Sequence, residues 1–100
     1  MRRVAWANSA RNELKQAISY IADDDPAAAR LVRHRIDSTV ALLAKRPIGR
    51  QGRVAGTYEK LVLRTSYILA YAISDDTVII LHLIHHHRDW PEGSWPEGSE

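Results

Sequence analysis

The chain has 100 residues, of which 45% are hydrophobic and 26% are charged, and its formal net charge is +2. This length and composition are those of one ordinary globular domain and not of a disordered chain. Because the sequence contains no cysteine, disulfide frameworks, cysteine nucleophiles and thiolate zinc sites are excluded.

The sequence gives no sign of membrane insertion or secretion. Its longest nearly pure apolar run, Tyr67 to Ile73, is far shorter than the roughly 20 residues of a membrane-spanning helix. The basic N-terminus has only four consecutive apolar residues, Val4 to Ala7, which is too short for the apolar region of a signal peptide. We therefore expect a cytoplasmic protein with no membrane partner.

Positive charge is concentrated in the middle of the chain. Residues 45–64 contain six Lys or Arg and one Glu, whereas residues 65–100 contain one Arg and six Asp or Glu. A dense basic block indicates an anionic partner, either nucleic acid or an acidic protein segment. Charge alone, however, favours a solvated surface loop.

The first predicted elements are a short strand and a helix. Val4 and Trp6 alternate within residues 2–7, which predicts an edge strand. Ser9 is expected to cap the following helix through its hydroxyl, and Pro26 ends this helix near residue 22 or 23. Its apolar face comprises Ala10, Leu14, Ala17, Ile18 and Ile21, and the residues expected to face water are Arg11, Glu13, Lys15 and Gln16.

A second helix follows after a very short turn. Asp25 is a suitable N-cap and Pro26 suits the first helical position, while Pro47 ends the helical pattern. Two helices joined so closely form an antiparallel hairpin. The apolar stripe of the second helix is Ala29, Val32, Ile36, Val40 and Leu43, and its predicted solvent side is Arg30, Arg33, His34 and Asp37.

Beyond a glycine-rich loop that ends at Thr57, the apolar period changes to two. Residues 58–64, 67–74 and 77–85 predict three strands in an antiparallel meander, the last of them in an interior position. The fold class is therefore α+β: an N-terminal edge strand and an antiparallel helical hairpin packed on an antiparallel β-sheet. The predicted core is Leu14, Ile18, Ile21, Val32, Ile36, Val40, Leu43, Leu61, Leu63, Ile79 and Leu81.

The C-terminal end carries a tandem duplication. The sequence Trp-Pro-Glu-Gly-Ser occupies residues 90–94 and recurs at residues 95–99. Pro, Gly, Ser and Glu resist regular structure, especially at a terminus. We expect a single domain over residues 1–91 and a flexible tail over residues 92–100.

Short motifs in a fixed order connect this sequence to a known superfamily. They are Ser9-Ala10, Glu13-Leu14, Ile18, Tyr20-Ile21, Pro26, Ala28-Ala29, Leu43-Ala44, Pro47, Gly49-Arg50, Gly52-Arg53-Val54, Gly56-Thr57, Tyr67-Ile68, Tyr71, His85, Arg88 and Trp90-Pro91. In this order and spacing, over residues 3–91, the chain resembles the RelE/ParE toxin superfamily of bacterial type II toxin–antitoxin modules. Its ending resembles the ParE or plasmid-stabilisation branch.

Two segments depart from the usual pattern of the superfamily. Thr57-Tyr58-Glu59-Lys60 stands where Thr-Arg-Glu-Leu is more usual, and the run His85-His86-His87 is unusual and receives no assigned role. The three adjacent histidines cannot all reach one ion from a strand, and no carboxylate stands beside them at ligand spacing. We therefore expect no metal site. His82 is interpreted as a histidine of the core or one covered by a partner.

The resemblance implies a toxin that arrests growth when its antitoxin is degraded, within a toxin–antitoxin hetero-oligomer. ParE-type members poison DNA gyrase by binding, whereas RelE-type members cleave mRNA on the ribosome with the same fold, so the fold alone does not decide the activity. Neither activity implies a cofactor. Under the gyrase interpretation the protein is not an enzyme, and the expected partner-binding residues are Arg50, Arg53, Arg64, His85, Arg88 and Trp90, since Arg and Trp are typical interface anchors.

The alternative, RNA cleavage, needs a general base, a general acid and cations around the phosphate. The residues of suitable type are Glu59, Lys60, Arg64, His85 and His87. On one continuous strand, however, Glu59 and Arg64 point to opposite faces, and the terminal tyrosine of RelE nucleases is missing. The sequence therefore favours the binding toxin and keeps the nuclease as the alternative. A third interpretation is an inactive toxin that survives as a partner for its antitoxin.

Overall fold

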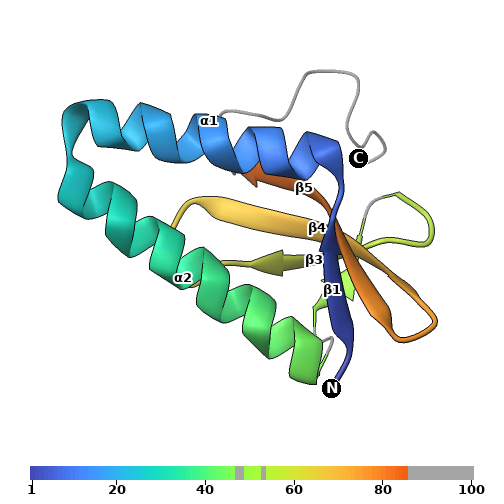
Figure 1. Ribbon diagram of the computed structural model, residues 1–100. Helices are drawn as coiled ribbons and strands as arrows, with labels where there is room; N and C mark the ends of the chain where they lie inside the picture. Colours follow the sequence, from blue (N-terminus) through green and yellow to red (C-terminus); the bar gives the residue numbers. More distant parts are fainter. Residues whose placement is uncertain (47–48, 53, 86–100) are drawn as a thin grey trace.

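The computed structural model describes residues 1–46, 49–52 and 54–85 (Figure 1). The elements are β1 (Arg3–Trp6), α1 (Asn8–Asp24), α2 (Pro26–Lys45), β2 (Arg50–Gln51), β3 (Tyr58–Leu61), β4 (Tyr67–Ser74) and β5 (Thr77–His85). The helices form a hairpin in front of one face of the sheet, which confirms the predicted α+β class. The predicted tail, residues 92–100, lies outside the described residues.

Within the described residues the sheet has five strands in the order β1-β5-β4-β3-β2. The predicted antiparallel sheet is in fact mixed, because β1 pairs with β5 in parallel while the other pairs are antiparallel. The predicted loop also contains β2, in which Arg50 pairs with Glu59 and Gln51 pairs with Tyr58. A strand of two residues among glycines has no alternating pattern that a sequence could reveal.

The turn between the helices follows the prediction. Asp25 is the N-cap of α2, and its Oδ1 accepts a hydrogen bond from the N–H of Ala28 at 3.1 Å. The N-cap of α1, by contrast, is Ala7. Ser9, the predicted cap, lies inside α1 and its hydroxyl donates to the C=O of Leu81 at 2.9 Å. A hydroxyl therefore joins the helix to the sheet instead of capping the helix.

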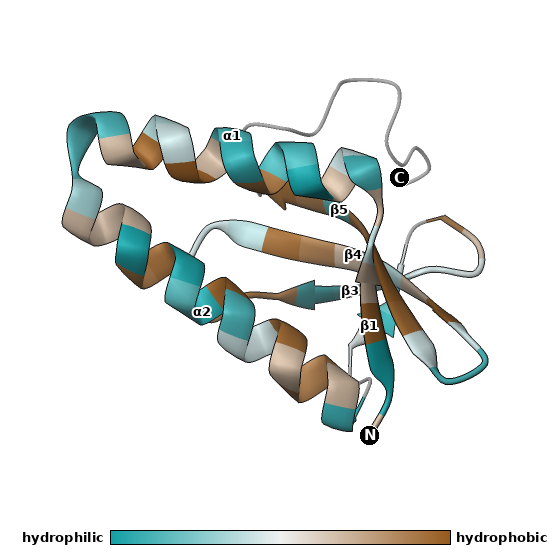
Figure 2. Cartoon of the chain, in the orientation of Figure 1, coloured by the Kyte–Doolittle hydropathy of each residue, from teal (hydrophilic) through white to brown (hydrophobic). Residues whose placement is uncertain are grey.

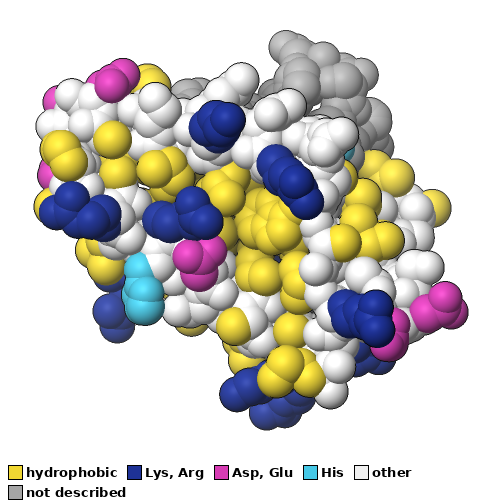
Figure 3. All heavy atoms as spheres, in the orientation of Figure 1, with side chains coloured by type: hydrophobic (Ala, Val, Ile, Leu, Met, Phe, Trp, Pro, Cys, Tyr) yellow, Lys and Arg dark blue, Asp and Glu magenta, His cyan; other side chains and the backbone are white. Residues whose placement is uncertain are grey.

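The core lies between the helical hairpin and the sheet. Figure 2 shows hydrophobic stretches of β4 and β5 behind the helices, and Figure 3 shows hydrophobic side chains in the gap between α1 and α2 with Lys and Arg around them. As predicted, the outer side of α2 is polar, and Arg33 and Asp37 form an exposed ion pair there at 3.2 Å. The fully buried large side chains are Ile36, Leu43, Val62, Leu69, Tyr71, Val78 and Ile80.

Part of the predicted core is wrong. Leu61 and Leu63 are 46% and 66% exposed, whereas Val62 between them is fully buried. Tyr58 and Val62 lie opposite the core residues Tyr71 and Tyr67, so the core face of β3 is theirs and Leu61 points to the other face. Leu63 lies beyond the end of the strand at Leu61.

The errors in β5 have two causes. Ile79 lies between the buried residues Val78 and Ile80 and so faces away from the core, whereas Leu81 is at a bulge. Ile79 and Leu81 are only partly buried, and neither belongs to the core cluster. Tyr71 pairs with Ile80 and Ala70 pairs with His82, so Leu81 is an extra residue in β5. Such a bulge reverses the faces of a strand, and Leu83 therefore takes the core position. Ile18 of α1 is likewise partly buried and outside the core cluster.

Neither of the helices in the described part of the chain is long and apolar enough to cross a membrane.

Candidate functional site

A row of polar residues crosses the sheet on the face away from the helices. Arg50 pairs with Glu59, Glu59 with Ala70, and Ala70 with His82. Residues directly opposite one another on neighbouring strands point to the same side. Because Leu69 and Tyr71 belong to the core beneath the helices, Ala70 and its row face the other way.

Glu59 is the centre of this row. It is 3% exposed, and it is the only charged residue buried within the described part of the chain. Its Oε1 lies 3.7 Å from a guanidinium nitrogen of Arg50, whose side chain is 71% exposed. A buried carboxylate is costly without a compensating charge, and Arg50 supplies an opposite charge beside Glu59 while keeping most of its own surface in water.

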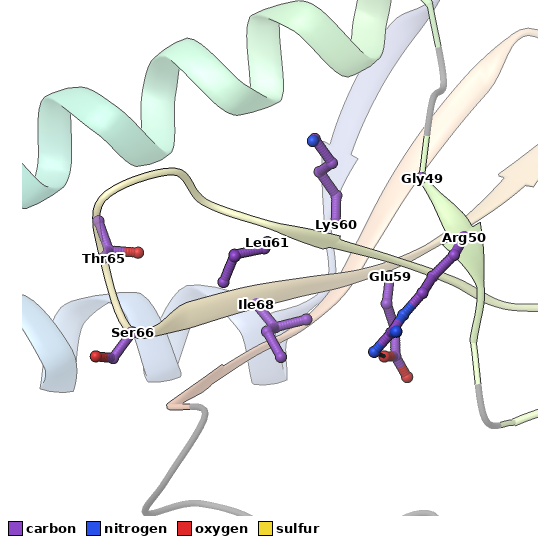
Figure 4. Close-up of a pocket in the computed structure, with 8 residues that line it drawn as sticks. All are labelled: Gly49, Arg50, Glu59, Lys60, Leu61, Thr65, Ser66 and Ile68. Carbon is purple, nitrogen blue, oxygen red and sulfur yellow. Dashed lines mark ion pairs between the residues drawn. The ribbon is translucent and has the colours of Figure 1, made fainter.

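A cavity of about 450 Å³ opens beside this ion pair, between β2 and the turn that joins β3 to β4. In Figure 4 the side chains of Arg50, Glu59 and Ile68 extend to one side of the sheet, whereas Lys60 extends to the opposite side. The cavity therefore offers both apolar and charged contacts. Its lining residues are Gly49, Arg50, Glu59, Lys60, Leu61, Thr65, Ser66 and Ile68.

Gly49 lets the chain approach the sheet closely at one end of the cavity. A Cβ atom there would stand 2.7 Å from the hydroxyl oxygen of Tyr71 and 2.8 Å from the carbonyl oxygen of Glu59. The Tyr71 ring stacks on Tyr58 with centroids 5.5 Å apart. Burial raises the pKa of Tyr71, and the neighbouring Tyr58 raises it further. Tyr71 is therefore a neutral side chain of the core, with its hydroxyl close to Gly49.

The other end of the row meets α1. Nδ1 of His82 lies 3.2 Å from Oε2 of Glu13, and Oε1 of Glu13 accepts a hydrogen bond from the N–H of Leu83 at 2.9 Å. The prediction that Glu13 faces water is therefore wrong. The helical pattern gave no signal for this contact, because it depends on where α1 lies against the edge of β5.

The structure places three of the six predicted partner-binding residues. Arg50 lies in the polar row, and Arg64 is exposed in the β3–β4 turn, where its C=O accepts a hydrogen bond from Arg35 at 3.1 Å. His85 lies at the end of β5 on the core side of the sheet, with its ring edge-on to Tyr67 at 5.2 Å. The other three predicted residues, Arg53, Arg88 and Trp90, lie outside the described residues.

The residues proposed for RNA cleavage do not converge. Glu59 and Lys60 extend to opposite faces of β3, and His85 lies on the core side of the sheet, away from Glu59. The remaining histidine of that set, His87, lies outside the described residues. Sequence reasoning missed that His82, and not His85, shares a row with Glu59, because the bulge at Leu81 reverses the faces of β5.

Among residues 1–46, 49–52 and 54–85, no group of three or more His, Asp or Glu side chains is arranged to hold a metal ion.

Residues 4–90 match the family described as "ParE toxin of type II toxin-antitoxin system, parDE". The chain is 40% identical over 92 residues to "Putative toxin Y4kP" of Sinorhizobium fredii (strain NBRC 101917 / NGR234). The aligned region covers 91% of this chain and 95% of that protein. The fold of this chain is similar to that of a solved chain of the "Chromosomal ParDE TA system from P. aeruginosa", with a TM-score of 0.74 and 20% sequence identity. The match covers 83% of this chain and 94% of that chain. The chain therefore belongs to the ParE toxin family of type II toxin–antitoxin systems.

Proposed function

We propose that this toxin stops growth by binding DNA gyrase and trapping its complex with cleaved DNA, and that a cognate antitoxin encoded beside it neutralises it. The resemblance to the ParE branch supports the gyrase target. Membership of the ParE family supports the antitoxin, as does the fold shared with a solved chain named for a ParDE system. The toxin works in the cytoplasm and uses no cofactor.

The divergence of the acid–base candidates is the observation that carries this proposal. A general base and a general acid must both come within about 2.6–3.2 Å of the atoms between which they move protons. Glu59 is buried against Arg50, Lys60 extends to the other face, and His85 packs on Tyr67. Exposed cations such as Arg50 and Arg64 are better suited to contact a partner surface than to catalyse a reaction.

The test is induced expression with two readouts, the DNA-damage response and cleavage of cellular mRNA. Glu59→Gln and His85→Ala remain toxic if the protein is a binder, whereas the pair Arg88→Ala with Trp90→Ala abolishes toxicity. Purified protein added to purified gyrase and plasmid should accumulate cleaved DNA. Thermal melts confirm that every variant is folded.

A folded Glu59→Gln or His85→Ala variant that loses toxicity together with mRNA cleavage would overturn the gyrase proposal. The absence of gyrase-dependent DNA cleavage by the wild-type protein would do the same.

One observation favours the alternative, an mRNA endonuclease that acts on the ribosome. The row from Arg50 through Glu59 to His82 places a cation, a carboxylate and an imidazole on one face, with only the small Ala70 between the last two. In that case Glu59→Gln and His82→Ala should each slow transcript cleavage by about 10²–10⁴-fold, the usual effect of losing a general acid or base.

A further inference from the structure

The end of α2 brings together cations from two distant parts of the sequence. Lys45 is the last residue of α2 and Arg46 is its C-cap. The C=O of Ala44 beside them accepts a hydrogen bond from the N–H of Arg2 at 2.8 Å. Figure 1 places the end of α2 beside the N-terminus, and Figure 3 shows Lys and Arg side chains at the same lower end of the molecule. We call Arg2, Lys45 and Arg46 the basic end.

The charges of the basic end are not neutralised within the described part of the chain. Lys45 and Arg46 are exposed, and none of the three cations forms an ion pair with a described carboxylate. Nε of Arg2 is buried and has no hydrogen-bond acceptor among the described residues. Clustered cations without a counter-charge produce a positive potential that attracts an anionic partner.

The acidic residues of the described chain do not offset this potential. Those at positions 23–25 lie at the opposite end of α2, which with 20 residues is about 30 Å long. Surface charges are screened over about 8 Å at physiological ionic strength. Asp76 lies on the β5 side of β1, where its C=O accepts the N–H of Arg3 at 2.8 Å. Arg3 has these acids beside it and is therefore not counted in the basic end.

The carbonyl groups at the end of α2 do not repel an anion there. A helix C-terminus carries about half a negative charge on its unpaired C=O groups. Here the C=O of Ala44 is bound by Arg2, and the C=O of Leu42 accepts a hydrogen bond from the N–H of Arg46 at 2.8 Å. The three full positive charges of the basic end exceed that partial charge, so an anion is attracted to it.

Duplex DNA is the anionic partner that fits the basic end and the proposed function together. It carries one negative charge per about 1.7 Å of its axis, and Lys and Arg bind its phosphates without contacting bases. Arg50, one of the expected partner-binding residues, begins β2 soon after Arg46. The four peptide links between Arg46 and Arg50 span at most about 15 Å. The basic end therefore adjoins the surface that is proposed to contact gyrase.

We propose that the basic end binds the phosphate backbone of the duplex DNA that gyrase holds. Arg2, Lys45 and Arg46 contact phosphates, and binding is therefore independent of base sequence. The exposed cations of β2 and the β3–β4 turn remain available to contact gyrase. This inference rests on the proposed function, since the gyrase proposal supplies the cleaved DNA as the partner.

Fluorescence anisotropy with a labelled DNA duplex tests the phosphate contacts over a range of salt concentrations. Lys45→Gln with Arg46→Gln should bind about tenfold or more weakly at low salt. The slope of log affinity against log salt concentration should become shallower by about 1.8, because each phosphate contact contributes about 0.9. Arg2→Gln should make it shallower by about 0.9. The matched control, Arg11→Gln with Lys15→Gln, removes two exposed cations of α1 and should keep the slope of the wild type.

Three results of the anisotropy experiment would overturn the inference. The first is an equal loss of affinity in the basic-end pair and the α1 pair, which would show that net charge alone drives binding. The second is the absence of saturable binding by the wild-type protein at low salt. The third is tighter binding to an RNA duplex of the same sequence. Thermal melts confirm that each variant is folded.

Purified gyrase with plasmid separates this inference from the gyrase proposal. The wild type should accumulate cleaved DNA, and Lys45→Gln with Arg46→Gln should need about tenfold more protein for the same amount, whereas the α1 pair should not. If the wild type traps cleaved DNA and the basic-end pair does so at the same concentration, the inference is wrong and the gyrase proposal stands. If the wild type binds the duplex with the expected slope but traps no cleaved DNA, the gyrase proposal is wrong.

Binding to the purified product of the gene adjacent to its own provides a further test. Unchanged duplex binding by Lys45→Gln with Arg46→Gln, together with weaker binding to that product, would assign the basic end to an acidic protein segment and overturn the inference.

Discussion

The two edges of the sheet differ in the elements that cover them. On the β5 side, β1 pairs in parallel over Thr77 to Ile80, and α1 then binds the next backbone groups through Ser9 and Glu13. On the β3 side, β2 has only two residues, and within the described residues it pairs with Tyr58 and Glu59. One edge is therefore held by both a strand and a helix, whereas the described part of the other edge is held by a strand of two residues alone.

The largest expected loss of stability comes from a buried side chain beneath the helices, and an exposed side chain just beyond β3 is its counterpart. Ile36→Ala removes a fully buried side chain and should lower the free energy of unfolding by about 2–5 kcal/mol. Leu63→Ala removes a side chain that is 66% exposed beyond the end of β3 and should change it by less than about 0.5 kcal/mol. Urea denaturation measures both. Equal losses would show that residue 63 packs in the core after all.

A smaller loss of stability is expected when the contact between α1 and β5 is removed. Glu13→Ala removes the acceptor of the Leu83 N–H and the contact with His82, so the buried Leu83 amide loses its hydrogen bond. The free energy of unfolding should fall by about 1–3 kcal/mol. Gln16→Ala, an exposed change on the same helix, is the control. If the two variants are equally stable, the contact of Glu13 with β5 does not contribute to stability.

The smallest effect concerns Tyr71 of β4, whose ring stacks on that of Tyr58 on the neighbouring strand β3. The pKa of Tyr71 is raised above 10.0 in the folded protein, first by burial and then by Tyr58. Above about pH 10 the unfolded chain therefore loses a proton that the folded chain keeps, and stability falls as pH rises toward the raised pKa. Tyr71→Phe removes this contribution.

Denaturation between about pH 9 and about pH 11 checks the prediction for Tyr71, because the linkage acts only around and above the unfolded pKa. The wild type should lose more stability across this range than the Phe variant, whatever their difference at neutral pH. Parallel curves for the two proteins would contradict it.

The helices were predictable because their signals are local. Asp25 caps α2 and Pro26 starts it, and Ala29, Ile36 and Leu43 recur on one face with the period of a helix. The candidate site was only partly predictable. From the sequence, Arg50 was assigned to the partner-binding set and Glu59 to the set for RNA cleavage, yet the two form an ion pair. This pairing could not be predicted, because β2 has no alternating pattern that would reveal a strand.

The sequence by itself determined the α+β class, the helical hairpin, the basic middle of the chain and the resemblance to ParE toxins, because periodicity, capping residues and charge act over short distances along the chain. Only the tertiary structure decided that β1 runs parallel to β5, that Glu13 binds β5 and that His82 instead of His85 shares the face of Glu59. The bulge at Leu81 changes which face the later side chains of β5 take, and pairing with Tyr71 and Tyr67 of β4 decides that Tyr58 and Val62 lie on the core face of β3. Neither feature leaves a mark in the alternation of residues, since both depend on how neighbouring strands pair.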